Sequence, residues 1–134
     1  MIFVETAVKA IIATGGSLAG YLWGGWSYLL SILVVFAVID FATGWVAAGM
    51  EGKLKSKISY VGAAKKALIF AIIAMCHMVD TALGNGHLVR DAAIFFYLAN
   101  EALSIIENAG RIGLPLPTML KNAVEVLREK GGAK

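Results

Sequence analysis

Carboxylate and amide side chains that could pair, or carry a proton or an ion, lie inside apolar parts of this chain. Asp40, Asp80 and Glu101, together with Asn100, each interrupt a run of hydrophobic residues. A charge at the centre of a membrane helix costs about 2.5–3.5 kcal/mol, so such a residue pairs with another polar group, faces water or serves an ion pathway. These four residues are therefore the first candidates for function.

Polar residues between positions 97 and 111 repeat at helical spacing. Steps of four, three, four and three residues put five side chains on one helix face: Tyr97, Glu101, Ser104, Asn108 and Arg111. Asn100 and Glu107 lie at the margins of this polar stripe. The opposite face is predicted to suit lipid and consists of Ala93, Phe96, Ala99, Leu103 and Ile106. The stripe either packs inside one copy, meets other copies or water, or relays protons or ions.

Residues that commonly catalyse reactions or bind metals show no productive spacing. His77 and His87 have no second ligand in an HxxxH or HExxH pattern, and no serine lies in a nucleophile elbow. The glycines of residues 15–20 are not followed by the Gly-Lys-Ser/Thr of a phosphate-binding loop. Cys76 is the only cysteine, which excludes an intramolecular disulfide. We predict a protein that is not an enzyme, with no catalytic residues, metal or cofactor.

The composition is that of a small membrane protein. Hydrophobic residues make up 59% of the 134 residues, charged residues 16%, and the mean hydropathy is +0.76. A soluble domain of this size needs more charged residues to cover its surface. The net charge of +3 comes from basic clusters that flank apolar runs, a pattern typical of membrane orientation rather than nucleic-acid binding. We therefore expect a lipid bilayer around the chain and no nucleic-acid partner.

The apolar runs predict an all-α, polytopic membrane helix bundle with three to four transmembrane helices, in a membrane domain of residues 1–112. From Ala10 to Met50 the only charge is Asp40. One helix over this span would be about 62 Å long, twice the ~30 Å hydrocarbon core, and the Gly24-Gly25 pair is the predicted break. Helices are expected near residues 6–23, 26–50, 63–83 and 88–109. The first helix either crosses the membrane or lies on its surface.

Residues 113–134 are predicted to form a Pro-containing linker and a short amphipathic C-terminal helix. Pro115 and Pro117 end the preceding helix, and apolar residues then recur with helical period. The loop of residues 50–66 carries five lysines and the C-terminal segment is also basic, so both are predicted to face the cytoplasm. Lys65 and Lys66 are expected to extend their side chains toward the membrane interface.

Small residues recur at four-residue spacing in two of the predicted helices. Gly16, Gly20 and Gly24 form one series, and Gly44 and Ala48 belong to another. Small residues at this spacing let two membrane helices approach backbone to backbone. These positions are therefore predicted to pack helices, against a partner from the same copy or from another.

The motifs that remain resemble one known family. Asp40-x-x-Thr43-Gly44 ends a predicted helix, Lys55-Ser56, Gly62 and Lys65-Lys66 follow, and YLANEALSIIENAGRIGLPLP begins at Tyr97. From about Phe36 to Leu127 the chain resembles the toxin-secretion and phage-lysis holin family, found in phages of Gram-positive bacteria. The motif positions become candidates for assembly, namely Asp40, Thr43, Gly44, Tyr97, Asn100, Glu101, Ser104, Glu107 and Asn108.

The resemblance implies a protein that accumulates in the host bacterial cytoplasmic membrane. Such a protein assembles with copies of itself and permeabilises the membrane, so that an endolysin reaches the cell wall or a toxin leaves. It implies neither cofactor nor catalysis. The residues alone leave other functions open: a small ion or proton transporter subunit that uses Asp40, Asp80 or Glu101, an antiholin-type regulator, or a membrane scaffold.

Overall fold

The computed structural model describes residues 1–130, which form five helices and no strand. The helices are α1 (Ile2–Trp23), α2 (Tyr28–Met50), α3 (Ser56–Leu83), α4 (Leu88–Ile112) and α5 (Thr118–Lys130). The first three are long and apolar enough to cross a membrane. The prediction of an all-α membrane bundle with a shorter C-terminal helix is therefore confirmed.

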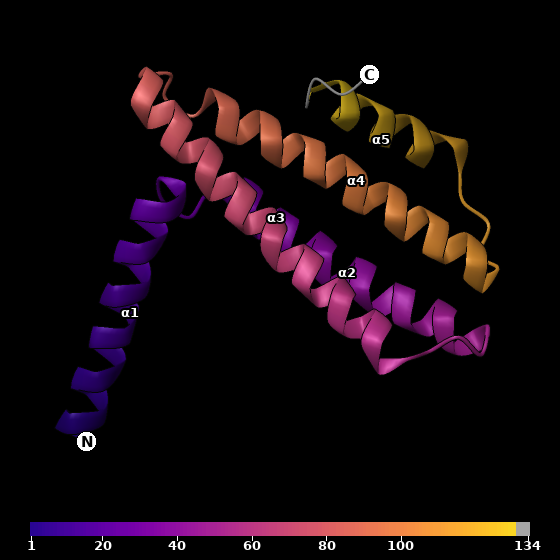
Figure 1. Ribbon diagram of the computed structural model, residues 1–134, viewed down its shortest axis with the longest axis horizontal. Coiled ribbons are helices and arrows are strands. Elements are labelled where there is room, and N and C mark those ends of the chain that lie inside the picture. The colour runs from indigo at the N-terminus through magenta and orange to yellow at the C-terminus, as the bar shows by residue number, and fades with distance from the viewer. Residues whose placement is uncertain (131–134) are drawn as a thin grey trace.

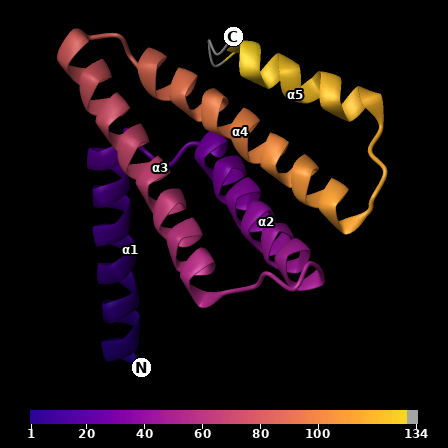
Figure 2. The ribbon, with the colours of Figure 1, turned by 45° about the vertical axis from the view of Figure 1, so that its right-hand side comes forward.

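Three helices form the packed body of the molecule. α2, α3 and α4 lie side by side in both ribbon views (Figures 1 and 2). Their shared core is formed by Leu30, Leu33, Ile73, Ile94 and Leu98. The connections make α3 antiparallel to both of its neighbours, whereas α2 and α4 run parallel.

Two hydrogen bonds mark the direction of α4 against α2. Arg90, in the first turn of α4, donates to the carbonyl of Trp23, the residue that ends α1. Asn108, near the other end of α4, donates to the carbonyl of Asp40 in α2. The start of α4 therefore lies near the residues that precede α2, and α4 runs parallel to α2.

α1 departs from this body at the predicted glycine break. Gly24 ends the helix in the left-handed conformation with a φ of 75°, and Gly25 follows with a φ of 103°. A non-glycine residue is strained in that region. No residue of α1 is buried, and the helix projects away from the bundle (Figure 1). Its contacts with the bundle lie near the glycine break, where Trp23 donates to the carbonyl of Phe70 in α3 and its own carbonyl accepts from Arg90 in α4.

Three helices are longer than the sequence predicts. α1 begins at Ile2 rather than near residue 6, α3 begins at Ser56 rather than near residue 63, and α4 ends at Ile112 rather than near residue 109. The added residues of α3 are mostly exposed and include Lys57 and two serines, so hydropathy does not reveal them. α4 ends where Gly113 takes a φ of 101°, just before Pro115 in the linker.

α5 packs on α4 instead of lying apart from the bundle. The linker of residues 113–117 reverses the chain, and α5 returns along α4 until Lys130 lies over the ring of Phe95, 5.7 Å from its centroid (Figure 2). Val124 is buried there. Ala99 points about 140° away from Ile94 around the α4 axis, yet it is only 1% exposed. The prediction of a lipid-facing surface is therefore wrong at Ala99, where α5 packs, whereas Phe96 of the same predicted face is 36% exposed.

Candidate functional site

Three charged side chains from three helices meet inside the bundle. The ammonium group of Lys66 in α3 lies 2.6 Å from a carboxylate oxygen of Asp40 in α2 and 2.8 Å from one of Glu101 in α4. Only 11% of the Asp40 side chain and 7% of the Glu101 side chain are exposed. We call these three residues the ion cluster. Since it joins α2, α3 and α4, it requires all three helices to be packed.

Asn108 extends the ion cluster through the α2–α4 contact. Its side-chain amide donates to the carbonyl of Asp40 at 3.1 Å, to the Asp40 carboxylate at 2.9 Å and to the Thr43 hydroxyl at 3.0 Å. Gly44 lies against the same side chain, since a Cβ atom there would stand 3.4 Å from the amide nitrogen, at ordinary contact distance. The spacing of the D-x-x-T-G motif therefore has a direct explanation: each of its three residues contacts Asn108.

A cavity with apolar walls and a few polar side chains leads from the end of the bundle to Asp40 and Lys66 of the ion cluster. It has a volume of about 330 Å³, and its lining includes Asp40, Lys66, Ser104 and Asn108 in the interior and Lys53 and Arg111 near the mouth. Ala48 also lines it. The cavity begins beside the α2–α3 loop, where Arg111 bonds Glu51 at 2.6 Å. Arg111 holds the pKa of the Glu51 carboxyl below its usual range through this hydrogen bond.

Lys66 is the member of the ion cluster that sequence analysis missed. It was expected to extend toward the interface, but it turns inward between two carboxylates. A buried ion needs a partner of opposite charge. Asp40 is the acid of α2, and Glu101 lies on the inner face of α4, so an acid on each helix beside α3 could have indicated the lysine.

A second polar cluster holds the α3–α4 turn together. The Asp80 carboxylate is fully buried and accepts hydrogen bonds from the backbone amides of Val89 and Arg90, both at 2.8 Å. These amides belong to the first turn of α4, which has free donors and a positive dipole end. Asp80 thus acts as a helix cap from a neighbouring helix.

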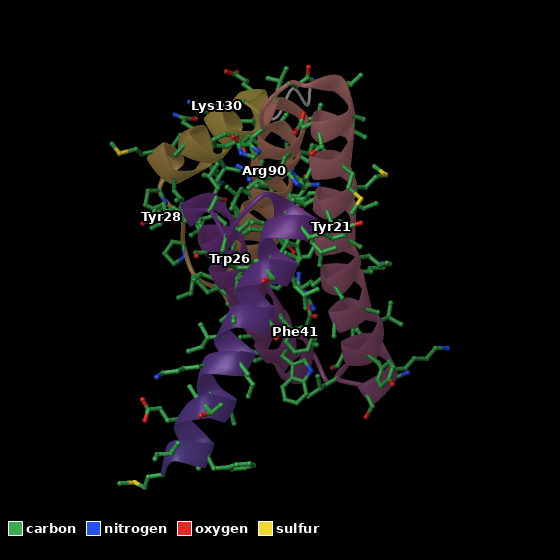
Figure 3. The ribbon with its side chains drawn as sticks, turned by 90° about the vertical axis from the view of Figure 1, so that its left-hand side faces the viewer. Tyr21, Trp26, Tyr28, Phe41, Arg90 and Lys130 are labelled. Atoms are coloured by element: carbon green, nitrogen blue, oxygen red, sulfur yellow. The ribbon has the colours of Figure 1, made fainter. Side chains whose placement is uncertain are left out.

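Arg90 and two histidines connect this turn with the α1–α2 link. Arg90 donates to the carbonyl of Trp23 at 2.7 Å and pairs with Asp91 at 2.9 Å, and it lies in the interior near that link (Figure 3). His77 and His87 have ring centroids 6.0 Å apart. A Cβ atom on Gly24 would come within 2.7 Å of His77. Gly24 is thus a close-approach position at the end of α1.

The structure separates other residues that the sequence grouped together. Glu101, Ser104 and Asn108 face the bundle interior, whereas Asn100 and Glu107 are exposed on the outside of α4. Tyr97 is half-buried beside Phe96. Gly16 and Gly20 have no neighbour where a Cβ would stand. Within residues 1–130, no three His, Cys, Asp or Glu side chains gather as a metal site would require.

Comparison with known proteins places these features in a family. The chain is 42% identical over 130 residues to an uncharacterized protein of Halalkalibacterium halodurans, covering 93% of this chain and 96% of that one. It is also 42% identical over 129 residues to an uncharacterized protein of Listeria monocytogenes, and the match covers 96% of this chain and 92% of that protein. An uncharacterized 14.9 kDa protein of Clostridium perfringens is 35% identical over 124 residues, and the match covers 92% of this chain and 94% of that protein. No solved structure matches.

The family match covers most of the chain. Residues 17–129 match the bacteriophage holin family, a span that includes the ion cluster, the Asp80 cap and most of α5. It confirms the resemblance seen in the motifs from Asp40 to Pro117. With three helices that can cross a bilayer, the chain is a non-enzymatic, multi-pass membrane protein and belongs to the bacteriophage holin family.

Proposed function

We propose that this protein is a phage holin that oligomerises in the bacterial cytoplasmic membrane and permeabilises it. The lesion lets an endolysin reach the cell wall, or lets a toxin leave, and host-cell lysis follows. The family match supports this proposal. The lysines of residues 50–66 and the basic C-terminal segment support a cytoplasmic position for both.

The observation that carries the proposal is the ion cluster inside an apolar bundle. Asp40 lies near the middle of α2, the most apolar of the helices, and Lys66 and Glu101 meet it there. One ammonium faces two carboxylates, and the cavity connects Asp40 and Lys66 to the bundle end. A single copy can therefore hide its charges from lipid. An assembly that repacks the same helices can expose those charges to water, which a permeabilising protein requires.

Expression in a bacterium tests the proposal. The chain is induced alone, and with a cytoplasmic endolysin that lacks its own export signal, while membrane potential, growth and turbidity are followed. We expect the chain alone to collapse the potential and stop growth, and the pair to lyse the culture. Endolysin alone is the control and should leave cells intact. Continued growth with an intact potential at high expression contradicts permeabilisation.

A steady ion or proton transporter is the second candidate, because the cavity reaches the buried carboxylate of Asp40. It predicts slow, ion-selective flux in liposomes without release of trapped dye, whereas a holin releases dye abruptly. An antiholin predicts a third result. Expressed alone it leaves the potential intact, but it delays lysis by a partner holin.

A further inference from the structure

An apolar groove lies between α2 and α3, two of the helices that are long and apolar enough to cross a membrane. It has a volume of about 410 Å³, and within residues 1–130 its lining comes from α2 and α3 alone. Lys66 lines it with its hydrocarbon stem, because the ammonium group is turned into the ion cluster. Val38 at the groove is 62% exposed, so the groove is open to its surroundings. Its occupant must therefore be apolar.

A pocket of about 540 Å³ adjoins this groove beside the α2–α3 loop, and the two share Ala63. The rest of its lining combines a lysine, two hydroxyls, two amphipathic rings and a leucine: Lys55, Ser56, Ser59, Trp45, Tyr60 and Leu54. Trp45 is 51% exposed and Tyr60 is 82% exposed. Exposed rings of this kind favour the headgroup level of a bilayer, and this places the pocket at the membrane interface.

The groove and the pocket together match the depth of one leaflet. Tyr60 in the pocket and Phe70 in the groove are ten residues apart on α3, which is about 15 Å at 1.5 Å per residue. Half of a ~30 Å hydrocarbon core is also about 15 Å. An acyl chain whose headgroup occupies the pocket therefore reaches the far end of the groove.

The charge beside the pocket favours an anionic headgroup. Lys53, Lys55 and Lys57 form no ion pair with another residue of the described range 1–130. Glu51, the acid of the same loop, is already paired with Arg111. Basic pockets between membrane helices bind anionic lipid headgroups. An apolar helix could fill the groove but offers these lysines no counter-ion, whereas an anionic phospholipid satisfies both the groove and the lysines.

We infer that the groove and the pocket bind an anionic phospholipid, with one acyl chain between α2 and α3 and the phosphate beside Lys55. The hydroxyl of Ser56 supplies a further hydrogen-bond donor at the pocket. The assignment to the cytoplasmic leaflet rests on the cytoplasmic position of residues 50–66 in the proposed function. The binding site itself requires only that α2 and α3 cross the membrane, and it does not depend on permeabilisation.

Mass spectrometry of the intact chain, purified in detergent, tests the site by counting retained lipids. Phosphatidylglycerol and phosphatidylcholine with identical acyl chains are added at equal concentration. We expect at least about tenfold more retained phosphatidylglycerol, the effect of one favourable hydrogen bond between charged groups. Glycerol phosphate carries a similar charge without a tail and should displace little of it. Equal retention of the two lipids, or full displacement by glycerol phosphate, overturns the inference.

Lysine variants locate the headgroup. Lys55→Ala is expected to lower phosphatidylglycerol retention several-fold and to leave phosphatidylcholine unchanged, whereas Lys55→Arg keeps the charge and most of the retention. Lys57→Ala is the matched control, because it removes the same charge two residues away and lines a different pocket. An equal loss in Lys55→Ala and Lys57→Ala indicates a general surface charge and contradicts the site.

Alanine variants locate the acyl chain. Ala67→Trp fills the groove and should lower the retention of both lipids, whereas Ala64→Trp, at an exposed position outside the groove, should not. Circular dichroism checks that both variants keep their helices. Unchanged lipid retention in Ala67→Trp contradicts the site. If Ala67→Trp instead shifts the oligomers seen in the same spectra, a second copy occupies the groove and the inference is overturned.

Dye release from liposomes keeps this inference separate from the proposed function. Selective retention of phosphatidylglycerol by a chain that releases no dye upholds the lipid site and contradicts permeabilisation. Dye release by a chain that retains both lipids equally upholds permeabilisation and contradicts the lipid site.

Discussion

Both polar clusters of this protein contain buried carboxylates, but these are held in different ways. Asp80 is bonded by backbone amides only nine and ten residues further along the chain, across one short turn. The ion cluster joins residues 26 and 35 positions apart from Lys66, on three helices. The first cluster depends on a local turn and the second on the packing of the whole bundle.

This difference separates a structural role from a functional one. A cap formed by a neighbouring turn persists whenever α3 and α4 form a hairpin. A cluster that requires three packed helices breaks when those helices separate, and its charges then need water or new partners. We therefore expect the ion cluster, and not the Asp80 cap, to respond to assembly.

Loss of Lys66 should have the largest effect on stability. Lys66→Met leaves the carboxylates of Asp40 and Glu101 buried without their cation, and removing one partner of a buried ion pair costs about 3–5 kcal/mol. Unfolding of purified protein in detergent measures this cost. The control is the triple variant with Asp40→Asn and Glu101→Gln added, which carries no net charge at the site and should recover much of the loss. A Lys66→Met protein as stable as wild type contradicts the cluster.

Loss of Asp80 should have a smaller and more local effect. Asp80→Ala removes the acceptor for two backbone amides at the start of α4, a change that costs about 1–2 kcal/mol for a helix cap. Hydrogen exchange should quicken at Val89 and Arg90 and stay slow near Asn108. Asp80→Asn keeps an acceptor and serves as control. If exchange quickens along the whole of α4, the two clusters are coupled and the comparison fails.

The smallest effect is expected at the mouth of the cavity. Because Arg111 lowers the pKa of Glu51 in the folded protein, this contact stabilises the fold above the unfolded pKa of about 4.5 and weakens as pH falls through the lower, folded value. Thermal stability of wild type should exceed that of Glu51→Gln near neutral pH, with the difference vanishing in acid. Both groups are exposed, so the difference should also shrink in high salt. A difference that persists in acid contradicts the ion pair.

Several features were predictable from sequence because they depend on nearest neighbours in the chain. The long apolar runs predict membrane helices, Gly24 and Gly25 predict the break, and the spacing from Tyr97 to Arg111 predicts a polar face on α4. Each of these follows from backbone conformation or from the period of the helix. The family was indicated by the motif from Asp40 to Gly44 together with the longer motif that begins at Tyr97.

The tertiary structure alone decided which polar residues pair and which face outward. The helical period places Glu101 on the polar stripe of α4 and Asn100 at its margin. It does not say which part of that stripe α2 and α3 contact. Packing turned Glu101 toward Lys66 and left Asn100 exposed. It also placed α5 over Ala99, which an amphipathic pattern cannot predict. Ion pairs and helix contacts join residues far apart in the chain, so their geometry exists only once the helices are packed.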